Sequence, residues 1–156
     1  MNDTVNFEHE LEVHDKIIYP NVGTSMMPML REHRDLMIIE KRGQNPLKVG
    51  DAVLFKRDNK YILHRIIGVN NNPDGITYDI VGDNQWRVEK NVNDSAVIGI
   101  LTAFVRDGVE ISVNDQDYLK YVNNKCRKPV ILFRIKLVFR YAVRALKRKL
   151  KRLKET

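Results

Sequence analysis

The sequence contains a single cysteine in 156 residues, so no disulfide can form within the chain. It also lacks a CxxC or CxxH cluster, which excludes the common structural zinc sites. The first 14 residues are polar and acidic, without the basic region and apolar run of a secretory signal or an N-terminal membrane span. A chain of this length fits one domain with a substantial hydrophobic core. No metal or cofactor is implied.

The net charge of +7 is unevenly distributed along the chain. Residues 127–156 hold twelve Lys or Arg against one acid, whereas residues 1–126 hold fifteen basic and nineteen acidic side chains. We therefore divide the chain into a mildly acidic globular domain, 1–126, and a strongly basic tail, 127–156. Such a tail favours an anionic partner, either lipid head groups or nucleic acid.

Short apolar segments separated by turn residues dominate the body of the chain. They indicate strands, and with one short N-terminal helix, from Asp3 or Thr4 to Ile18, they predict a mostly β domain. Val5, Leu11, Val13 and Ile17 are the expected inward positions of that helix. The predicted strand segments are 35–40, 47–56 with a turn at Gly50 and Asp51, 61–69, 76–81, 96–106 and 109–113.

The basic tail has the pattern of one long amphipathic helix. From Leu132 to Leu153 apolar residues recur in steps of three and four, and a basic stripe lies about a third of a turn away. Spanning a bilayer is disfavoured, since each basic residue at mid-membrane costs roughly 2.5–3.5 kcal/mol. The pattern suits a helix that lies in the membrane interface, or one that packs its apolar stripe on the domain. Nucleic acid is disfavoured as a partner because no aromatic and basic recognition pattern accompanies the charge.

Three polar residues in strand-like surroundings suggest catalysis. Ser25 lies in an apolar run between a glycine and a proline, and His64 interrupts an apolar strand segment. Asp83 follows in the sequence Gly-Asp-Asn. A serine hydroxyl needs a base to become a nucleophile, and a histidine oriented by a carboxylate can serve as that base. Each residue alone also fits a structural role, as a turn residue or as a hydrogen-bonded core histidine.

Four segments together resemble the signal peptidase I clan of serine peptidases. Residues 23–30, GTSMMPML, resemble its nucleophile motif, Gly-x-Ser-Met-x-Pro-x-Leu, and residues 50–55, GDAVLF, resemble its next strand. The His-Arg-Ile at 64–66 is similar to the His-Arg-Val of the endoplasmic-reticulum and sporulation-type enzymes, in which histidine replaces lysine. Gly-Asp-Asn at 82–84 resembles the final motif. The resemblance covers about residues 20–110 and implies a signal-peptidase-like β fold.

The resemblance implies a serine endopeptidase that acts through an acyl-enzyme. It makes Ser25 the nucleophile and His64 the general base. Asp83 is the first choice for the acid that orients His64. The histidine branch often has a second aspartate six residues later, where this chain has Glu89, so either acid could complete the triad.

The same resemblance implies an oxyanion site and a substrate cleft. Some members of the family place a serine two residues before the nucleophile, but this chain has Gly23 there. The expected donors to the oxyanion are therefore the Ser25 backbone N–H and Thr24. The cleft would accept a polypeptide, and its expected lining residues, for which core packing is an equally good explanation, are Met26, Met27 and Ile62.

The chain departs from the family pattern in one respect. Only 24 residues precede Ser25, and they carry no apolar anchor segment, so we expect a short member without the N-terminal membrane anchor. They are also too few for the DNA-binding domain of the related self-cleaving repressors. The expected location is peripheral to a membrane, through the tail at 127–156, with a cytoplasmic enzyme as the alternative. The alternative function is a catalytically inactive module that binds peptides or membranes.

Overall fold

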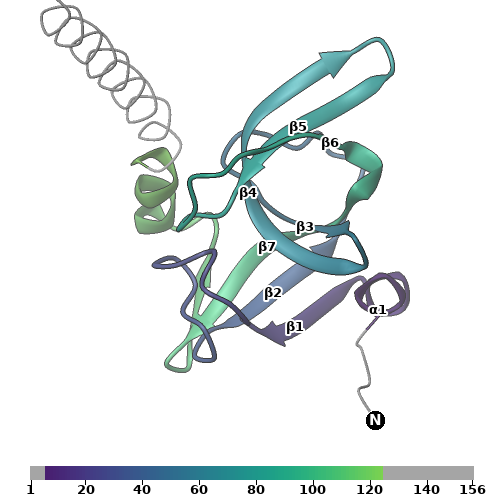
Figure 1. Ribbon diagram of the computed structural model, residues 1–156. Helices are drawn as coiled ribbons and strands as arrows, with labels where there is room; N and C mark the ends of the chain where they lie inside the picture. Colours follow the sequence, from purple (N-terminus) through teal and green to yellow (C-terminus); the bar gives the residue numbers. More distant parts are fainter. Residues whose placement is uncertain (1–5, 125–156) are drawn as a thin grey trace, which may run out of the picture.

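The described part of this computed structural model, residues 6–124, is mostly β, as the sequence predicts (Figure 1). Its strands form one antiparallel sheet in the order β1-β2-β7-β3-β4-β5-β6, and β8 pairs with β7. The long helix predicted for the tail lies outside the described residues. The elements are α1 (Phe7–His14), β1 (Lys16–Pro20), β2 (Leu36–Lys41), β3 (Ala52–Arg57), β4 (Lys60–Asn72), β5 (Gly75–Val81), β6 (Glu89–Asn93), the 3-10 turn η1 (Asp94–Ala96), β7 (Val97–Arg106), β8 (Val109–Ser112) and a further helix at 116–124.

The N-terminal helix is shorter than predicted. It ends where Asp15 adopts a left-handed conformation, with φ 56°, and donates its N–H to the Leu11 carbonyl. Ile17 is buried, but as part of β1, where it pairs with Ile39 of β2. Val13 is 57% exposed, so its assignment to the inward face was wrong. Leu11 therefore packs from the helix and Ile17 from the strand that follows it, because the helix ends at His14.

The core lies on both faces of β3. Ala52 and Leu54 pack into a cluster with α1, β2 and the helix at 116–124, while Val53 and Phe55 pack into a second cluster with β4 and β5. All four side chains are buried. A strand covered on both faces needs apolar residues at every position rather than at alternate ones, which explains the unbroken run in the sequence.

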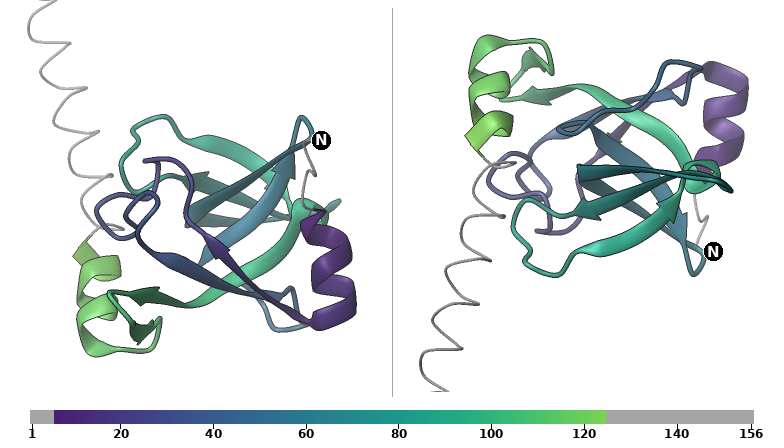
Figure 2. Two further views of the ribbon diagram at one scale, coloured as in Figure 1. Left: turned by 90° about the horizontal axis from the view of Figure 1, so that it is seen from below. Right: turned by 90° about the horizontal axis from the view of Figure 1, so that it is seen from above.

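The two helices lie on opposite sides of the molecule (Figure 2). The helix at 116–124, which sequence reasoning did not identify, lies on the same side as the loop that carries Ser25 (Figure 2). It contributes Tyr118 and Val122 to the core. Gly50 has φ +106° and faces this helix so closely that a Cβ there would lie 2.9 Å from Val122 Cγ1. A residue without a side chain is therefore needed where the turn before β3 meets the helix.

A buried ion pair connects the helix to the sheet. Arg65 of β4 is 1% exposed, and its Nε and Nη2 donate to the two carboxylate oxygens of Asp83 at 2.8 and 2.7 Å. Its Nη1 donates to the Gly50 carbonyl at 2.7 Å and to the Tyr118 hydroxyl at 3.1 Å. The Tyr121 hydroxyl donates to Asp83 at 3.1 Å. The carboxylate thus fixes the loop after β5 against β4 and the helix.

We expect Asp83→Ala to destabilise the protein by about 3–5 kcal/mol, because it leaves the Arg65 guanidinium buried without its counter-ion. The measurement is the free energy of unfolding in urea. Asp117→Ala is the matched control, since the Asp117 side chain is 95% exposed and should change stability by no more than about 0.5 kcal/mol. A loss below about 1 kcal/mol for Asp83→Ala would contradict the structural role of the pair.

Candidate active site

The Ser25 loop joins β1 to β2 and is held by hydrogen bonds at its start. Gly23 has φ +95°, a conformation that favours glycine, and its N–H donates to Glu32 Oε1 at 2.9 Å. The Asn21 side-chain amide donates to the Gly23 carbonyl at 3.2 Å. Beyond the serine, Met26 and Leu30 are buried in the core. The loop therefore presents Ser25, which is half-buried, from a fixed backbone.

The end of the same loop is anchored by Asp35. Its buried carboxylate accepts from the Arg31 backbone N–H at 2.7 Å and from Arg106 Nε and Nη2 at 3.1 and 2.5 Å. Arg106 also donates to the Met29 carbonyl at 2.6 Å. Burial opposes the charge of Asp35, but these hydrogen bonds outweigh it and hold the pKa of the carboxyl below its ordinary value. Asp35 therefore stays ionised and ties the loop to β7.

His64 lies in β4, opposite Val53 of β3, and is 4% exposed. The Phe55 ring lies 6.1 Å from the imidazole, centroid to centroid. Burial lowers the pKa of His64 below its ordinary value of 6.5, an effect that the nearby Glu89 carboxylate opposes. The imidazole is therefore neutral at neutral pH, the state that a general base requires.

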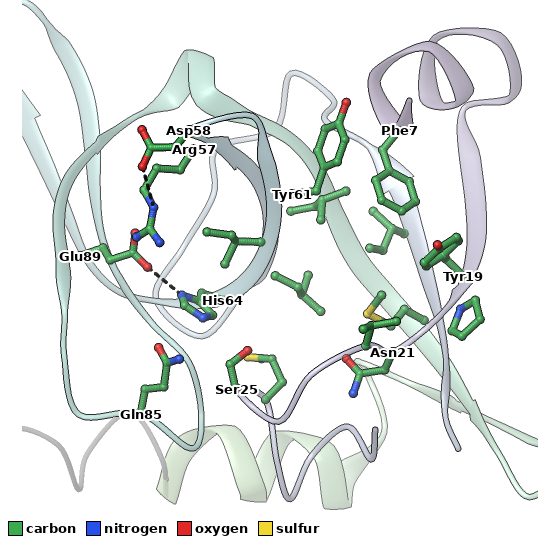
Figure 3. Close-up of a pocket in the computed structure, with 18 of the residues that line it drawn as sticks. Phe7, Tyr19, Asn21, Ser25, Arg57, Asp58, Tyr61, His64, Gln85 and Glu89 are labelled. Carbon is green, nitrogen blue, oxygen red and sulfur yellow. Dashed lines mark hydrogen bonds and ion pairs between the residues drawn. The ribbon is translucent and has the colours of Figure 1, made fainter. Parts of the chain in front are cut away.

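Ser25 and His64, 39 residues apart in sequence, face each other across the cavity (Figure 3). They meet at Gly82, where a Cβ would lie 3.1 Å from Ser25 Cβ and 3.0 Å from His64 Nε2. The same Cβ would lie 2.7 Å from the Ser25 carbonyl oxygen, and no real Cβ comes this close to a backbone atom. Glycine at this position thus allows the hydroxyl-bearing carbon and the ring nitrogen to come together.

The segment after Gly82 fixes the serine backbone. The Asn84 N–H donates to the Ser25 carbonyl at 2.7 Å, and its side-chain amide donates to the Thr24 carbonyl at 3.2 Å. Among residues 6–124, no acceptor is found for the Ser25 N–H, which remains available to an oxyanion. Thr24 is exposed and does not line the cavity; its carbonyl holds the loop.

The acid beside His64 is Glu89, at the start of β6. Glu89 Oε1 lies 3.1 Å from His64 Nδ1, an ion-pair distance, although the two groups are not aligned as a regular hydrogen bond. The other carboxylate oxygen accepts from Arg57 Nη1, and both residues lie at the cavity (Figure 3). Asp83, the first choice from the sequence, accepts hydrogen bonds from Arg65 at both of its oxygens, and its negative charge also raises the pKa of His64.

The cavity beside Ser25 and His64 has a volume of about 1020 Å³. Of the three predicted lining residues, Met26 and Ile62 line it, whereas Met27 does not. Sequence reasoning missed Arg57, because a basic residue at the end of a strand carries no signal that would distinguish it from other surface residues. It also missed the aromatic side chains that line the cavity away from the serine, Phe7, Tyr19 and Tyr61.

Within residues 6–124, no three His, Cys, Asp or Glu side chains cluster in a way that could hold a metal ion. In the same part of the chain, no helix is both long and apolar enough to cross a bilayer.

No protein-family model matches this chain, and no curated protein shows significant sequence similarity to it.

Proposed function

We propose that this protein is a serine endopeptidase of the signal-peptidase type. The observation that carries the proposal is that Ser25 and the buried, neutral His64 lie close together beside the cavity. Glu89 lies beside the other ring nitrogen, Nδ1. Glu89 Oε1 lies 3.1 Å from Nδ1 and favours the proton on that nitrogen, which leaves Nε2 as the proton acceptor. The closeness of these two residues, distant in the sequence, supports activation of the serine hydroxyl by the imidazole.

The reaction proceeds in two steps. Ser25 Oγ bonds to the carbonyl carbon of the substrate while His64 Nε2 takes its proton, and the carbonyl electron pair moves onto oxygen, where the Ser25 N–H can stabilise it. The C–N bond then breaks, and the amine leaves with the proton from His64. In the second step His64 deprotonates a water molecule, which attacks the ester carbon. His64 then returns the proton to Ser25 Oγ as the C–O bond breaks, and the new carboxylic acid leaves and loses its own proton to water.

Glu89 and Arg57 act on the base in opposite directions. The Glu89 carboxylate raises the pKa of His64 and Arg57 lowers it, with burial as the larger effect. Arg57 also fixes the second oxygen of Glu89, which has one more rotatable bond than an aspartate. The longer acid therefore needs a second contact to stay against the ring, and Arg57 supplies it.

We also propose that the enzyme works at an anionic membrane surface. The support is the sequence pattern of residues 127–156, in which a basic stripe and an apolar stripe share one amphipathic helical repeat. Each basic residue near such a surface contributes up to about 1 kcal/mol.

Ser25→Ala and His64→Ala should each abolish reaction with a serine-directed fluorophosphonate, because one variant removes the nucleophile and the other its base. Labelling is followed by intact mass, and circular dichroism checks folding. Ser95→Ala, which changes a serine outside the cavity, is the matched control and should label like the parent. If the parent is not labelled, or Ser25→Ala is labelled as fast as the parent, the protease proposal fails and a binding module becomes the better reading.

The labelling rate should fall on the acid side with a midpoint below pH 6.5, since His64 must be neutral and its pKa is lowered. Arg57→Gln removes a positive charge, so the midpoint should move to higher pH. Glu89→Gln removes a negative charge, so the midpoint should move to lower pH. The measurement is the second-order rate constant against pH for the three proteins. Shifts in the same direction, or none, would contradict the assigned roles.

The full chain should sediment with vesicles containing anionic lipid and not with neutral ones, in proportions that fall as salt is added. Arg144→Glu with Lys147→Glu should weaken this binding. Lys60→Glu with Lys90→Glu, an equal change of charge on exposed body residues, is the control. Equal loss in both double variants would assign the binding to overall charge rather than to the tail.

A further inference from the structure

The cavity has an aromatic end, formed by side chains from three elements. The ring of Phe7 in α1 lies 4.8 Å from Tyr19 of β1 and 4.9 Å from Tyr61 of β4, centroid to centroid, with interplanar angles of 89° and 85°. All three rings are half-buried. Figure 3 shows them on the side of the cavity away from Glu89. Such edge-to-face contacts stabilise the rings against one another.

This aromatic end is held in place by α1. The Glu8 carboxylate accepts from Lys56 Nζ at 2.7 Å, an ion pair that lowers the pKa of Glu8. Glu12 accepts from Lys41 at 2.8 Å, and Leu11 is buried in the core between these two contacts. The helix is thus tied to both β2 and β3, which keeps the Phe7 ring at the cavity without a ligand.

The cavity wall next to the aromatic end is formed by buried apolar side chains of the core. Three buried residues that line the cavity, Met37, Ile39 and Leu54, belong to the hydrophobic cluster against which the rings pack. The Tyr61 hydroxyl is turned to the helix, where it is 3.2 Å from both Asn6 Oδ1 and Glu8 Oε2. A ligand group bound at this end would therefore be stabilised mainly by burial of its apolar surface.

The opposite side of the catalytic pair has a different character. Gln85, Trp86 and Arg87 line it from the loop between β5 and β6, and all three side chains are exposed. Figure 3 shows Ser25 and His64 between Gln85 on one side and Phe7 and Tyr19 on the other. An acyl-enzyme must retain the acyl part of its substrate and release the amine, so the enclosed end suits the acyl part and the exposed side suits the departing amine.

We propose that the aromatic end is a subsite for a large apolar side chain, such as Leu, Met or Phe, on the acyl side of the scissile bond. The proposal rests on the proposed peptidase function and names the substrate class: peptides with a bulky apolar residue a short distance before the cleavage site. Phe7 is its specificity-determining residue. The same cavity contains both Ser25 and Phe7, so one extended peptide can reach both.

Peptidyl phosphonate probes test this, because the peptide they carry occupies the acyl side when phosphorus bonds to the serine. In the full-length protein, Ala, Leu and Phe are compared at each of the three residues before phosphorus. We expect one position at which Leu or Phe reacts at least about tenfold faster than Ala. Phe7→Ala should reduce that ratio several-fold, and Phe7→Trp should disfavour Phe relative to Leu. Val13→Ala, on the exposed face of α1, should leave the ratio unchanged.

The ratio of labelling rates for Leu or Phe probes to Ala probes tests the subsite separately from the catalytic reaction. Labelling at Ser25 with no preference at any position, or a preference that both Phe7 variants leave intact, would overturn the subsite while the peptidase proposal stands. If no probe labels the parent protein, the peptidase proposal fails, and the subsite proposal, which depends on it, fails as well. If Phe7→Ala does not fold, which circular dichroism would reveal, the ratio for Phe7→Trp decides, since that variant keeps an aromatic side chain at this position.

Discussion

The buried pairing of Arg65 with Asp83 is the constraint on which the site depends. It connects β4, the loop after β5 and the helix at 116–124 through hydrogen bonds that use every nitrogen of the guanidinium. Arg65 follows His64 directly, and Asp83 follows Gly82 directly. The ion pair therefore sets the separation between the imidazole and the glycine beside which the serine lies. Because both charged groups are almost fully buried, loss of either would leave an unpaired charge in the core.

The structure divides two tasks between two carboxylates that look equivalent in the sequence. Asp83 forms a buried ion pair with Arg65 and has a structural role, whereas Glu89 lies 3.1 Å from the His64 ring. Asp83, the acid that directly follows Gly82, is thus the one paired with Arg65, and Glu89 supplies the 3.1 Å contact with the imidazole. Burial is the largest influence on the pKa of His64, and among the neighbouring charges that of Glu89 has the largest effect, ahead of those of Arg57 and Asp83.

The serine loop is stabilised independently of the histidine. Asp35 and Arg106 anchor its end to β7, and Glu32 holds its start at Gly23. The contact with Asn84 then aligns it with the loop after β5. A rigid strand and a rigid loop are thus brought together before any ligand is present, which reduces the entropic cost of reaching a reactive geometry.

The sequence by itself determined the β class, most of the strands and the identity of Ser25 and His64 as a candidate pair, because apolar periodicity and short local motifs are properties of neighbouring residues. Tertiary structure decided which acid meets His64 and that Phe7 reaches the cavity. The first depends on how β4 and β6 bring the side chains of His64 and Glu89 together, and the second depends on how α1 packs against β2 and β3. No local pattern encodes these distances, since they are set by contacts between elements far apart in the sequence.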